Sequence, residues 1–269
     1  MTNKRLLAMQ DLSCVGQCSL TVVHPILSAY GIETCMLPTA VLSNHTMFSK
    51  WSYLDLTDEI KNIFEVWRGE GFKFDGFLLG YLGKTPLMET AETCFRDFSA
   101  DGAIRIIDPV FADNGRIYGG FDMTYVEAMA KFISNADIIL PNVTEACFLT
   151  GTPYSAAHTK EYLENLIRAL GKLTKATAVI TGVELDGKIG EVICENGRIS
   201  YVLGEKLPVS LHGTGDIFAA TFTAAYLQGK SVAESADFAS EFVRDCIRKT
   251  PKEHFYGACF EQVLAKNLG

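Results

Sequence analysis

The segment LHGTGDIFAATFTAAYLQG at residues 211–229 joins a glycine-rich turn to an apolar helix. Gly213 and Gly215 bracket Thr214 in the turn, and Asp216 follows them directly. The first amides of a helix lack intrahelical partners and carry partial positive charge, and glycines let a phosphate approach them closely. The turn therefore predicts a cradle for negative charge. The Asp216 carboxylate beside it predicts a base that takes a proton from a hydroxyl group attacking a phosphoryl group.

A plainer interpretation is a loop in which Asp216 only offsets the helix dipole. The turn matches neither the GxxxxGK[ST] loop nor the GxGxxG fingerprint of dinucleotide-binding proteins. On its own it therefore indicates anion binding without identifying the reaction.

Four more polar residues come directly after apolar segments that have the character of strands. They are Asp11, Asp108, Asn142 and Thr181. In an open α/β sheet, ligands bind beyond the carboxyl ends of the strands, so we expect these side chains to lie on one rim. Each of them taken alone could instead close a strand or begin a turn. The spacing of Asn142 and Glu145 also predicts a capping box at the start of a helix.

The elements that must position these residues are short apolar strands alternating with amphipathic helices. The strand candidates are RLLAMQ (5–10), ETCMLPTAV (33–41), GFLLGYLG (76–83), IRIIDPV (104–110), ADIILPN (136–142) and ATAVITG (176–182). Their nearly continuous apolar character is typical of strands covered on both faces.

The helix candidates show their own signals. One stripe of the segment 161–170 carries Leu163, Leu166, Ile167 and Leu170. Ser231 and Glu234 form a predicted capping box before the helix at 231–247. The DG and NG pairs within residues 186–205 predict a short antiparallel stretch. Together the elements predict an open, mostly parallel α/β sheet with an antiparallel edge.

Composition narrows the class of protein. The chain has 269 residues, 48% of them hydrophobic, and a net charge of −8, which suits one domain spanning residues 1–269. Its acidic balance and scattered basic residues disfavour a nucleic-acid surface. No apolar run is long enough for a signal peptide or a membrane span, so we expect a cytoplasmic protein. The eight cysteines form no CxxC pair, so we expect reduced, mostly buried thiols and no zinc site.

Several motifs together resemble a known family. GTGDIFAA resembles the signature of the ribokinase-like superfamily, whose members phosphorylate alcohols with ATP. In chain order, SNHTMFSKW (43–51), GYLG (80–83), IDPVFADNGRIY (107–118) and PNVTEA (141–146) resemble the pyridoxal kinase branch. The resemblance runs from about the first strand to the C-terminal helices. It implies a three-layer α/β/α fold with a flap loop rather than a large lid domain.

The resemblance also implies roles at the phosphoryl-transfer site. Asp216 matches the base that acts on the 5′-hydroxyl group of a vitamin B6 vitamer, and Gly213, Thr214 and Gly215 match the anion hole. The nucleotide and metal positions are matched by Asn142, Glu145, Thr181, Asp108 and Asp113, with Glu145 and Asp108 near Mg²⁺. The stretch Asp113–Tyr118 matches a flap over ATP. The implied cofactors are ATP, Mg²⁺ and a monovalent cation such as K⁺, and the implied assembly is a homodimer.

Thr39, His45 and Tyr81 match positions that line the pyridine pocket. His45 could instead be a hydrogen-bonded core histidine, and Tyr81 could simply fill a gap at the end of a strand. Asp11 departs from the family pattern, because many pyridoxal kinases carry a serine there. A carboxylate could pair with the ammonium group of pyridoxamine, so we predict a preference for pyridoxamine or pyridoxine over pyridoxal, which an Asp11→Ser variant would alter.

Two rival functions stay open at this point. A hydroxymethylpyrimidine kinase of the same superfamily is favoured by Asp11 and opposed by SNHT and GYLG. A non-catalytic ligand-binding protein is possible because a fold does not fix a function. A dinucleotide-binding oxidoreductase is disfavoured because the first strand continues into QDLSCVGQ without the required glycines.

Overall fold

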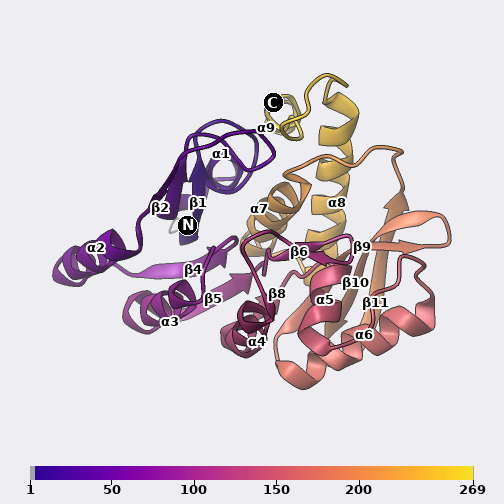
Figure 1. Cartoon of the computed structure of the whole chain (residues 1–269), viewed down its shortest axis with the longest axis horizontal. Coiled ribbons are helices and arrows are strands. Elements are labelled where there is room, and N and C mark those ends of the chain that lie inside the picture. The colour runs from indigo at the N-terminus through magenta and orange to yellow at the C-terminus, as the bar shows by residue number, and fades with distance from the viewer. Residues whose placement is uncertain (1–3, 269) are drawn as a thin grey trace.

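The computed structural model describes residues 4–268 and contains a nine-stranded sheet with the order β11-β10-β9-β8-β5-β4-β1-β2-β3 (Figure 1). Its strands are β1 (Arg5–Ser13), β2 (Glu33–Leu42), β3 (Tyr53–Asp55), β4 (Phe74–Leu79), β5 (Ser99–Ile107), β8 (Ile138–Ile139), β9 (Thr177–Leu185), β10 (Lys188–Glu195) and β11 (Arg198–Glu205). Strands β6 (Ala112–Asp113) and β7 (Arg116–Ile117) form a separate hairpin.

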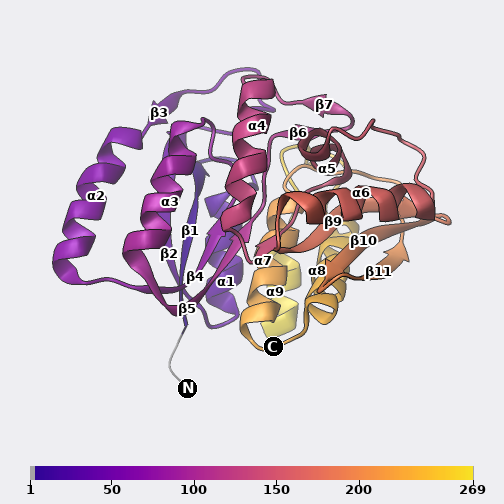
Figure 2. The same ribbon diagram turned by 90° about the horizontal axis from the view of Figure 1, so that it is seen from below.

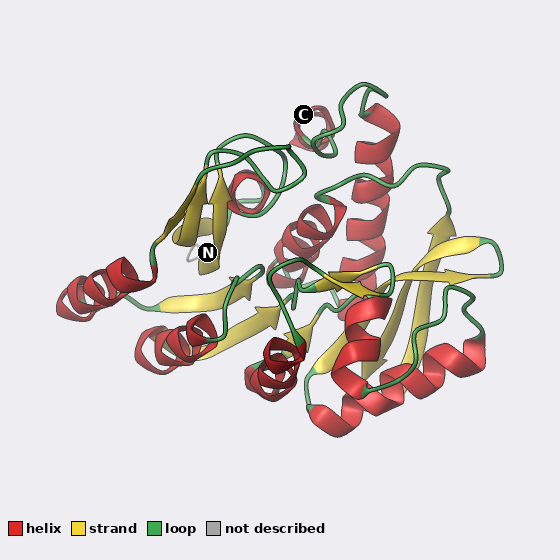
Figure 3. Ribbon diagram, in the orientation of Figure 1, coloured by secondary structure: helices red, strands yellow, loops and turns green. Residues whose placement is uncertain are grey.

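Helices cover both faces of the sheet, as Figures 1 and 3 show. One face carries α2 (Thr57–Glu70), α3 (Pro86–Phe98), α4 (Met123–Phe132), α5 (Val143–Thr150) and α6 (Lys160–Leu173). The other carries α1 (Leu20–Ala29), α7 (Thr214–Leu227), α8 (Val232–Lys249) and α9 (Glu261–Leu268). A single 3₁₀ turn, Ile133–Asn135, follows α4. The predicted three-layer α/β/α architecture is confirmed.

Alternation along the central strands builds two separate cores. In β1, Leu7 and Met9 pack in the core under α2–α6, whereas Leu6 and Ala8 pack in the core under α1 and α7–α9. Successive side chains of a strand point to opposite faces, so a nearly continuous apolar run fills both cores. This explains why the central strands lack an alternation of apolar and polar residues.

The sheet is parallel in its centre and antiparallel at both edges. Strand β3 pairs antiparallel with β2, an edge that the sequence did not reveal. At the other edge β10 pairs antiparallel with β9 and β11, as predicted. The predicted DG and NG turns are present, with positive φ at Asp186, Gly187, Asn196 and Gly197. Positive φ at both central residues is the geometry of type I′ hairpin turns.

Several predicted strand boundaries are wrong. Asp11, predicted to follow the first strand, lies inside β1, which continues to Ser13. The segment GYLG lies outside β4, which ends at Leu79. Thr181 lies inside β9 rather than after it. The reason is that β9 changes partners along its length: Thr177 and Ala178 pair with parallel β8, and the strand then continues against antiparallel β10.

The helix predictions hold. The four apolar residues of the α6 stripe are all fully buried. Ser231 and Glu234 form the expected capping box at α8.

All eight cysteines are free; four are buried and Cys14 is exposed. Among the described helices, none combines the length and apolar character needed to cross a bilayer.

Candidate active site

Backbone hydrogen bonds between neighbouring strands place the predicted polar residues along one rim. The Asp108 amide donates to the Leu79 carbonyl at the end of β4 (2.9 Å), and the Thr181 amide donates to the Pro141 carbonyl beyond β8 (2.9 Å). Asn142 and Thr181 form a parallel β-bridge. The carboxyl ends of the central strands therefore bring these residues to the same edge, as the sequence predicts.

The glycine-rich turn begins helix α7 at this rim. Gly213 is the N-cap with a φ of +79°, and a Cβ on it would lie 1.9 Å from the carbonyl oxygen of Gln17. Only glycine fits both the conformation and the contact. The amides of Thr214, Gly215 and Asp216 lie in the first turn, where helical amides have no intrahelical acceptor. The turn thus offers the predicted cradle for an anion.

Asp216 and Asp108 line one narrow space between β1, β4 and α7, together with Gln10 and Gly80. The space is too narrow to hold a water molecule. Burial raises the pKa of Asp216 to about 7; the Ser19 backbone amide opposes the rise and the Asp11 carboxylate adds to it. Asp216 therefore titrates near neutral pH, where a general base works best.

Positive side chains are missing from this group of carboxyl groups. Within residues 4–268, no lysine or arginine forms an ion pair with Asp11, Asp108, Glu145 or Asp216. Burial raises the pKa of Asp108 well above its usual range, and the charges of Glu145 and Asp216 add to the shift. These buried carboxyl groups favour their neutral forms, and a bound cation would stabilise their charged forms.

Asn142 and Glu145 form the predicted capping box of α5. The Asn142 side chain accepts from the Glu145 amide (2.9 Å), and Glu145 Oε2 accepts from the Asn142 amide (2.9 Å). Glu145 Oε1 accepts from the Phe111 amide (2.9 Å). Both carboxylate oxygens thus already have backbone donors. Burial still raises the pKa of Glu145, which is 2% exposed.

The predicted flap is a β-hairpin. Asp113 pairs with Arg116 across the β6–β7 turn, whose central residues Asn114 and Gly115 both have positive φ. The Gly115 amide donates to Thr144 Oγ1 (3.0 Å). The hairpin is therefore attached to the start of α5, and Figure 2 shows it beside that helix.

A cleft of about 320 Å³ opens beside the flap. Six of the residues that line it are Asp113, Asn142, Thr144, His158, Thr181 and Gly182. Three residues assigned to the nucleotide by resemblance, Asp113, Asn142 and Thr181, thus share one cavity. The two assigned to the metal, Asp108 and Glu145, do not line it.

Sequence reasoning missed His158. Its Nδ1 accepts from the Glu184 amide (2.9 Å), which leaves the hydrogen on Nε2, and Nε2 is buried without a partner among the described residues. Burial lowers the pKa of His158, so the ring beside the cleft is neutral. No motif contained this residue, because the contact depends on the packing of the loop before α6 against β9.

The residues predicted for the substrate pocket lie around β1, β2 and β4. Asp11 is 5% exposed, and its oxygens accept from Ser13 Oγ (3.1 Å) and Ser19 Oγ (2.5 Å). Thr39 is buried in β2 at the shift of register opposite Asp11. The half-buried Tyr81 follows β4 and packs on Phe121, with ring centroids 5.4 Å apart. Burial raises the pKa of Tyr81 to about 12, and Asp11 contributes.

His45 has the contacts of the alternative, a hydrogen-bonded core histidine. Its Nδ1 accepts from the Met47 amide (3.2 Å), so Nε2 carries the hydrogen and donates to the Tyr256 carbonyl (2.8 Å). The ring is 3% exposed and packs 4.6 Å from the ring of His212. Both ring nitrogens are occupied, so His45 has no free donor or acceptor for a ligand in this structure.

The side chains at the rim fit Mg²⁺ only if water and substrate phosphates supply most of the ligands of the ion. Within the described part of the chain no three histidine, cysteine, aspartate or glutamate side chains converge as a metal cage. Mg²⁺ typically uses one or two carboxylates together with waters and substrate phosphates. Asp108 has no cationic partner and suits this role directly, whereas Glu145, with both oxygens engaged, suits it through water.

Comparison with known proteins places the chain among kinases. The family profile described as phosphomethylpyrimidine kinase matches residues 27–258. A pyridoxal kinase of Granulibacter bethesdensis is 26% identical over 261 residues, which cover 91% of this chain and 89% of that protein.

The solved structures to which this chain is similar are also kinases. A Bacteroides thetaiotaomicron protein assigned to the phosphomethylpyrimidine kinases is 37% identical, with a TM-score of 0.94 over 99% of this chain and 94% of that one. Another crystal form of that protein contains pyridoxal. The pyridoxal kinase of Lactobacillus plantarum is 32% identical, with a TM-score of 0.91 over 98% of this chain and 96% of that one. The ribokinase-like fold is thereby confirmed.

Proposed function

We propose that this chain, which belongs to the phosphomethylpyrimidine kinase family, transfers a phosphoryl group from ATP to the 5′-hydroxyl group of a vitamin B6 vitamer. One observation carries the proposal: Asp216 stands in the first turn of α7, inside the cradle of free amides, with a pKa near 7 and no cationic side chain to neutralise it. A carboxylate in that position can accept the proton of an attacking alcohol.

Each part of the site has a task in this reaction. Asp216 takes the proton of the 5′-hydroxyl group, and the amides from Thr214 to Asp216 stabilise the charge on the transferred group. The 320 Å³ cleft holds the nucleotide, with Asn142 and Thr181 at its phosphate end and the neutral His158 ring in its wall. The β6–β7 hairpin closes over the nucleotide and excludes water.

Mg²⁺ would be held by Asp108 and, through water, by Glu145. When bound, it neutralises charge on the nucleotide phosphates. We also propose a monovalent cation such as K⁺ at the rim, a single kinase domain and a cytoplasmic homodimer. The exposed apolar side chains around β3, Trp51 at 48%, Tyr53 at 50% and Leu54 at 61%, support a contact between copies.

A vitamer panel tests the proposal. Purified protein with Mg²⁺ and ATP is given pyridoxal, pyridoxine, pyridoxamine or hydroxymethylpyrimidine, and both ADP and the phosphorylated product are measured. We expect product from at least one B6 vitamer in a one-to-one ratio with ADP. ADP without product, or no turnover of any B6 vitamer, would contradict the proposal.

The second candidate is a hydroxymethylpyrimidine kinase, which the family description and the carboxylate at Asp11 favour. The same panel separates the two. The pyridoxal found in a crystal form of the Bacteroides thetaiotaomicron relative and the pyridoxal kinases among the similar proteins support the B6 assignment.

A further inference from the structure

Four loops from different parts of the chain meet beside the glycine-rich turn. They are the loop after β1 (residues 14–19), the loop after β2 (residues 43–52), the loop before α7 (residues 206–213) and the segment between α8 and α9 (residues 250–260). Figure 1 shows the first of these loops reaching the segment before α9. The hydrogen bonds between the loops show what this meeting does.

The Tyr256 carbonyl group joins three of the loops. It accepts a hydrogen bond from the Gln17 amide (3.2 Å) and another from His45 Nε2 (2.8 Å). In the same segment, the Ala258 amide donates to the His212 carbonyl group (3.1 Å). The segment between α8 and α9 therefore holds both the loop after β1 and the loop that leads into α7.

Three glycines with positive φ let these loops approach closely. A Cβ on Gly16 would collide with the ring of His45. A Cβ on Gly257 would lie 2.6 Å from the Cβ of Gln17, and one on Gly213 would collide with the carbonyl oxygen of that same residue. Glycine is therefore required at all three positions, both for the conformation and for the contact.

His45 is the side chain at the centre of this arrangement. Its ring is 3% exposed, lies against Gly16 and packs 4.6 Å from the ring of His212. Its two nitrogens are bonded to the backbone, Nδ1 to the Met47 amide and Nε2 to the Tyr256 carbonyl group. The ring therefore serves as a fixed link between loops.

Gln17 carries this link to the amide cradle. Its amide is held by the Tyr256 carbonyl group, and its own carbonyl oxygen lies against Gly213, the N-cap of α7. The Gly213 carbonyl group in turn accepts the first helical hydrogen bond, from the Ile217 amide (3.0 Å). A shift of Gln17 would therefore release the residue from which the amides of residues 214–216 project.

We infer that His45 is a positioning residue for the amide cradle. Its Nε2–H group fixes the Tyr256 carbonyl group, which holds Gln17 in place beside the N-cap and so sets the direction of the first amides of α7. This inference rests on the proposed role of the cradle in phosphoryl transfer. It gives the SNHT motif a task at the phosphoryl group in place of the contact with the pyridine ring that the resemblance implies.

Two substitutions at position 45 test the hydrogen bond. His45→Leu keeps an apolar side chain and loses the donor, so Tyr256 and Gln17 should be held less firmly. We expect kcat to fall about tenfold, the effect of one lost hydrogen bond, with the KM values for ATP and vitamer within about twofold of wild type. His45→Gln keeps an N–H donor at the end of its side chain, so we expect it to retain most of kcat.

Gly257→Ala tests the same link without changing His45. The added Cβ would push Gln17 away, so we expect a similar loss of kcat, about tenfold, with both KM values unchanged. Gly71→Ala is the matched control, because Gly71 ends α2 with a φ of +70° and has open space around its Cβ position. This control should lower only the melting temperature. Melting temperatures of all variants separate a loss of folded protein from a loss of turnover.

Hydrogen exchange of the Ile217 amide reports on the first turn of α7 without any turnover. Because this amide is bonded to Gly213, loosening of the N-cap should expose it to solvent. We expect exchange measured by NMR to be about tenfold faster in His45→Leu and Gly257→Ala, and unchanged in Gly71→Ala. This measurement does not depend on the substrate, so it separates a failure of this inference from a failure of the proposed function.

Three results would overturn the inference. Wild-type exchange of Ile217 in folded His45→Leu would show that the link does not hold the turn. Equal losses of kcat in His45→Leu and His45→Gln would remove the role of the hydrogen bond. A rise of the vitamer KM in both variants with unchanged kcat would assign His45 to the substrate.

Discussion

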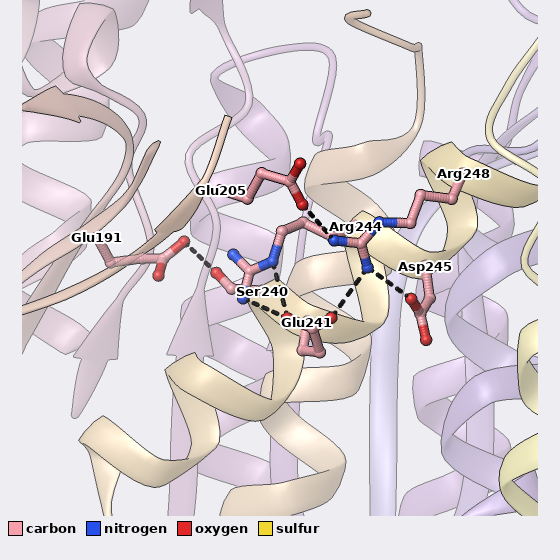
Figure 4. Close-up of polar contacts among 7 residues, drawn as sticks. All are labelled: Glu191, Glu205, Ser240, Glu241, Arg244, Asp245 and Arg248. Carbon is pink, nitrogen blue, oxygen red and sulfur yellow. Dashed lines mark hydrogen bonds and ion pairs between the residues drawn. The ribbon is translucent and has the colours of Figure 1, made fainter. Parts of the chain in front are cut away.

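Acidic side chains gather in two regions of this molecule, and the two regions differ in the positive partners that they supply. The rim carboxyl groups are Asp11, Asp108, Glu145 and Asp216. The second region, the α8 network, joins β10 and β11 to α8 and consists of Glu191, Glu205, Ser240, Glu241, Arg244, Asp245 and Arg248 (Figure 4).

The α8 network contains its own positive charges. Glu191 Oε1 accepts from Ser240 Oγ (2.7 Å), and the charge of Arg244 stabilises the Glu191 carboxylate. Arg244 also pairs with Glu241 (2.7 Å), and Arg248 pairs with three acidic residues. Within residues 4–268, the rim carboxyl groups have no such ion pair. The difference supports the proposal that bound ligands complete the rim, whereas the fold itself completes the α8 network.

The largest expected effect comes from removing one carboxylate in each region. Asp216→Asn keeps the shape of the side chain and loses the base, so we expect kcat to fall by ~10²–10⁴-fold with folding intact. Glu191→Gln is the matched control, and its kcat should stay within about twofold because it lies outside the rim. Steady-state kinetics and thermal melting of both proteins give the answer. Near-wild-type turnover in Asp216→Asn would rule out its role as the base.

A second comparison uses two glycines with almost the same positive φ. Gly213 has a φ of +79° and lies against Gln17, whereas Gly197 has a φ of +77° with open space around its Cβ position. Gly213→Ala should distort the amide cradle and lower kcat by ~10²-fold, the cost of losing one such donor. Gly197→Ala should cost about 1 kcal/mol of stability and no activity. Equal activity losses in the two variants would show that the cradle is not special.

The sequence predicts more of the scaffold than of the site. Continuous apolar runs, the NG and DG turns and the capping boxes are local signals, and each of them is confirmed. The NG pair at Asn114 and Gly115 is a hairpin signal that also explains the flap. The resemblance, rather than the spacing of residues, assigns the nucleotide positions.

What the sequence did not reveal depends on contacts between distant segments. Thr181 lies inside β9 because β10 extends that strand, and His158 becomes a cleft residue only by packing on Glu184. The hydroxyl groups of Ser13 and Ser19 on Asp11 require a shift of strand register and a positive φ. No local pattern of residue types encodes these features.

In the α8 network, removing the cation should affect stability and spare catalysis. Arg244 is 10% exposed at its side chain, and it lies beside Glu191. Arg244→Met raises the pKa of Glu191 further and keeps the side chain neutral, so we expect about 1 kcal/mol less stability at pH 8.5. The double variant with Glu191→Gln should recover most of that loss. Urea unfolding measures both, and a loss of kcat in the folded Arg244→Met protein would contradict the comparison.

The last prediction concerns the pH dependence of stability in that network. Burial raises the pKa of Glu191 to about 8 in the folded chain, above its ordinary value of 4.5. Between these values the unfolded state loses its proton first, so this group destabilises the fold progressively as pH rises and does so fully above about pH 8. The stability of Glu191→Gln relative to wild type should therefore increase by on the order of 1–3 kcal/mol as the pH rises from 5 to 8.5. A constant difference across that range would show that Glu191 is not held neutral by burial.

The most direct test of the central claim is a single-turnover experiment on Asp216. Enzyme is present in excess over ATP, Mg²⁺ is saturating, and the B6 vitamer is one that the panel shows to be a substrate. Phosphoryl transfer is followed by rapid quenching, and nucleotide binding is measured separately. We predict that Asp216→Asn slows the transfer step by ~10²–10⁴-fold and leaves the Kd for nucleotide within about twofold. An unchanged transfer step, or a loss explained by weaker nucleotide binding alone, would contradict the account.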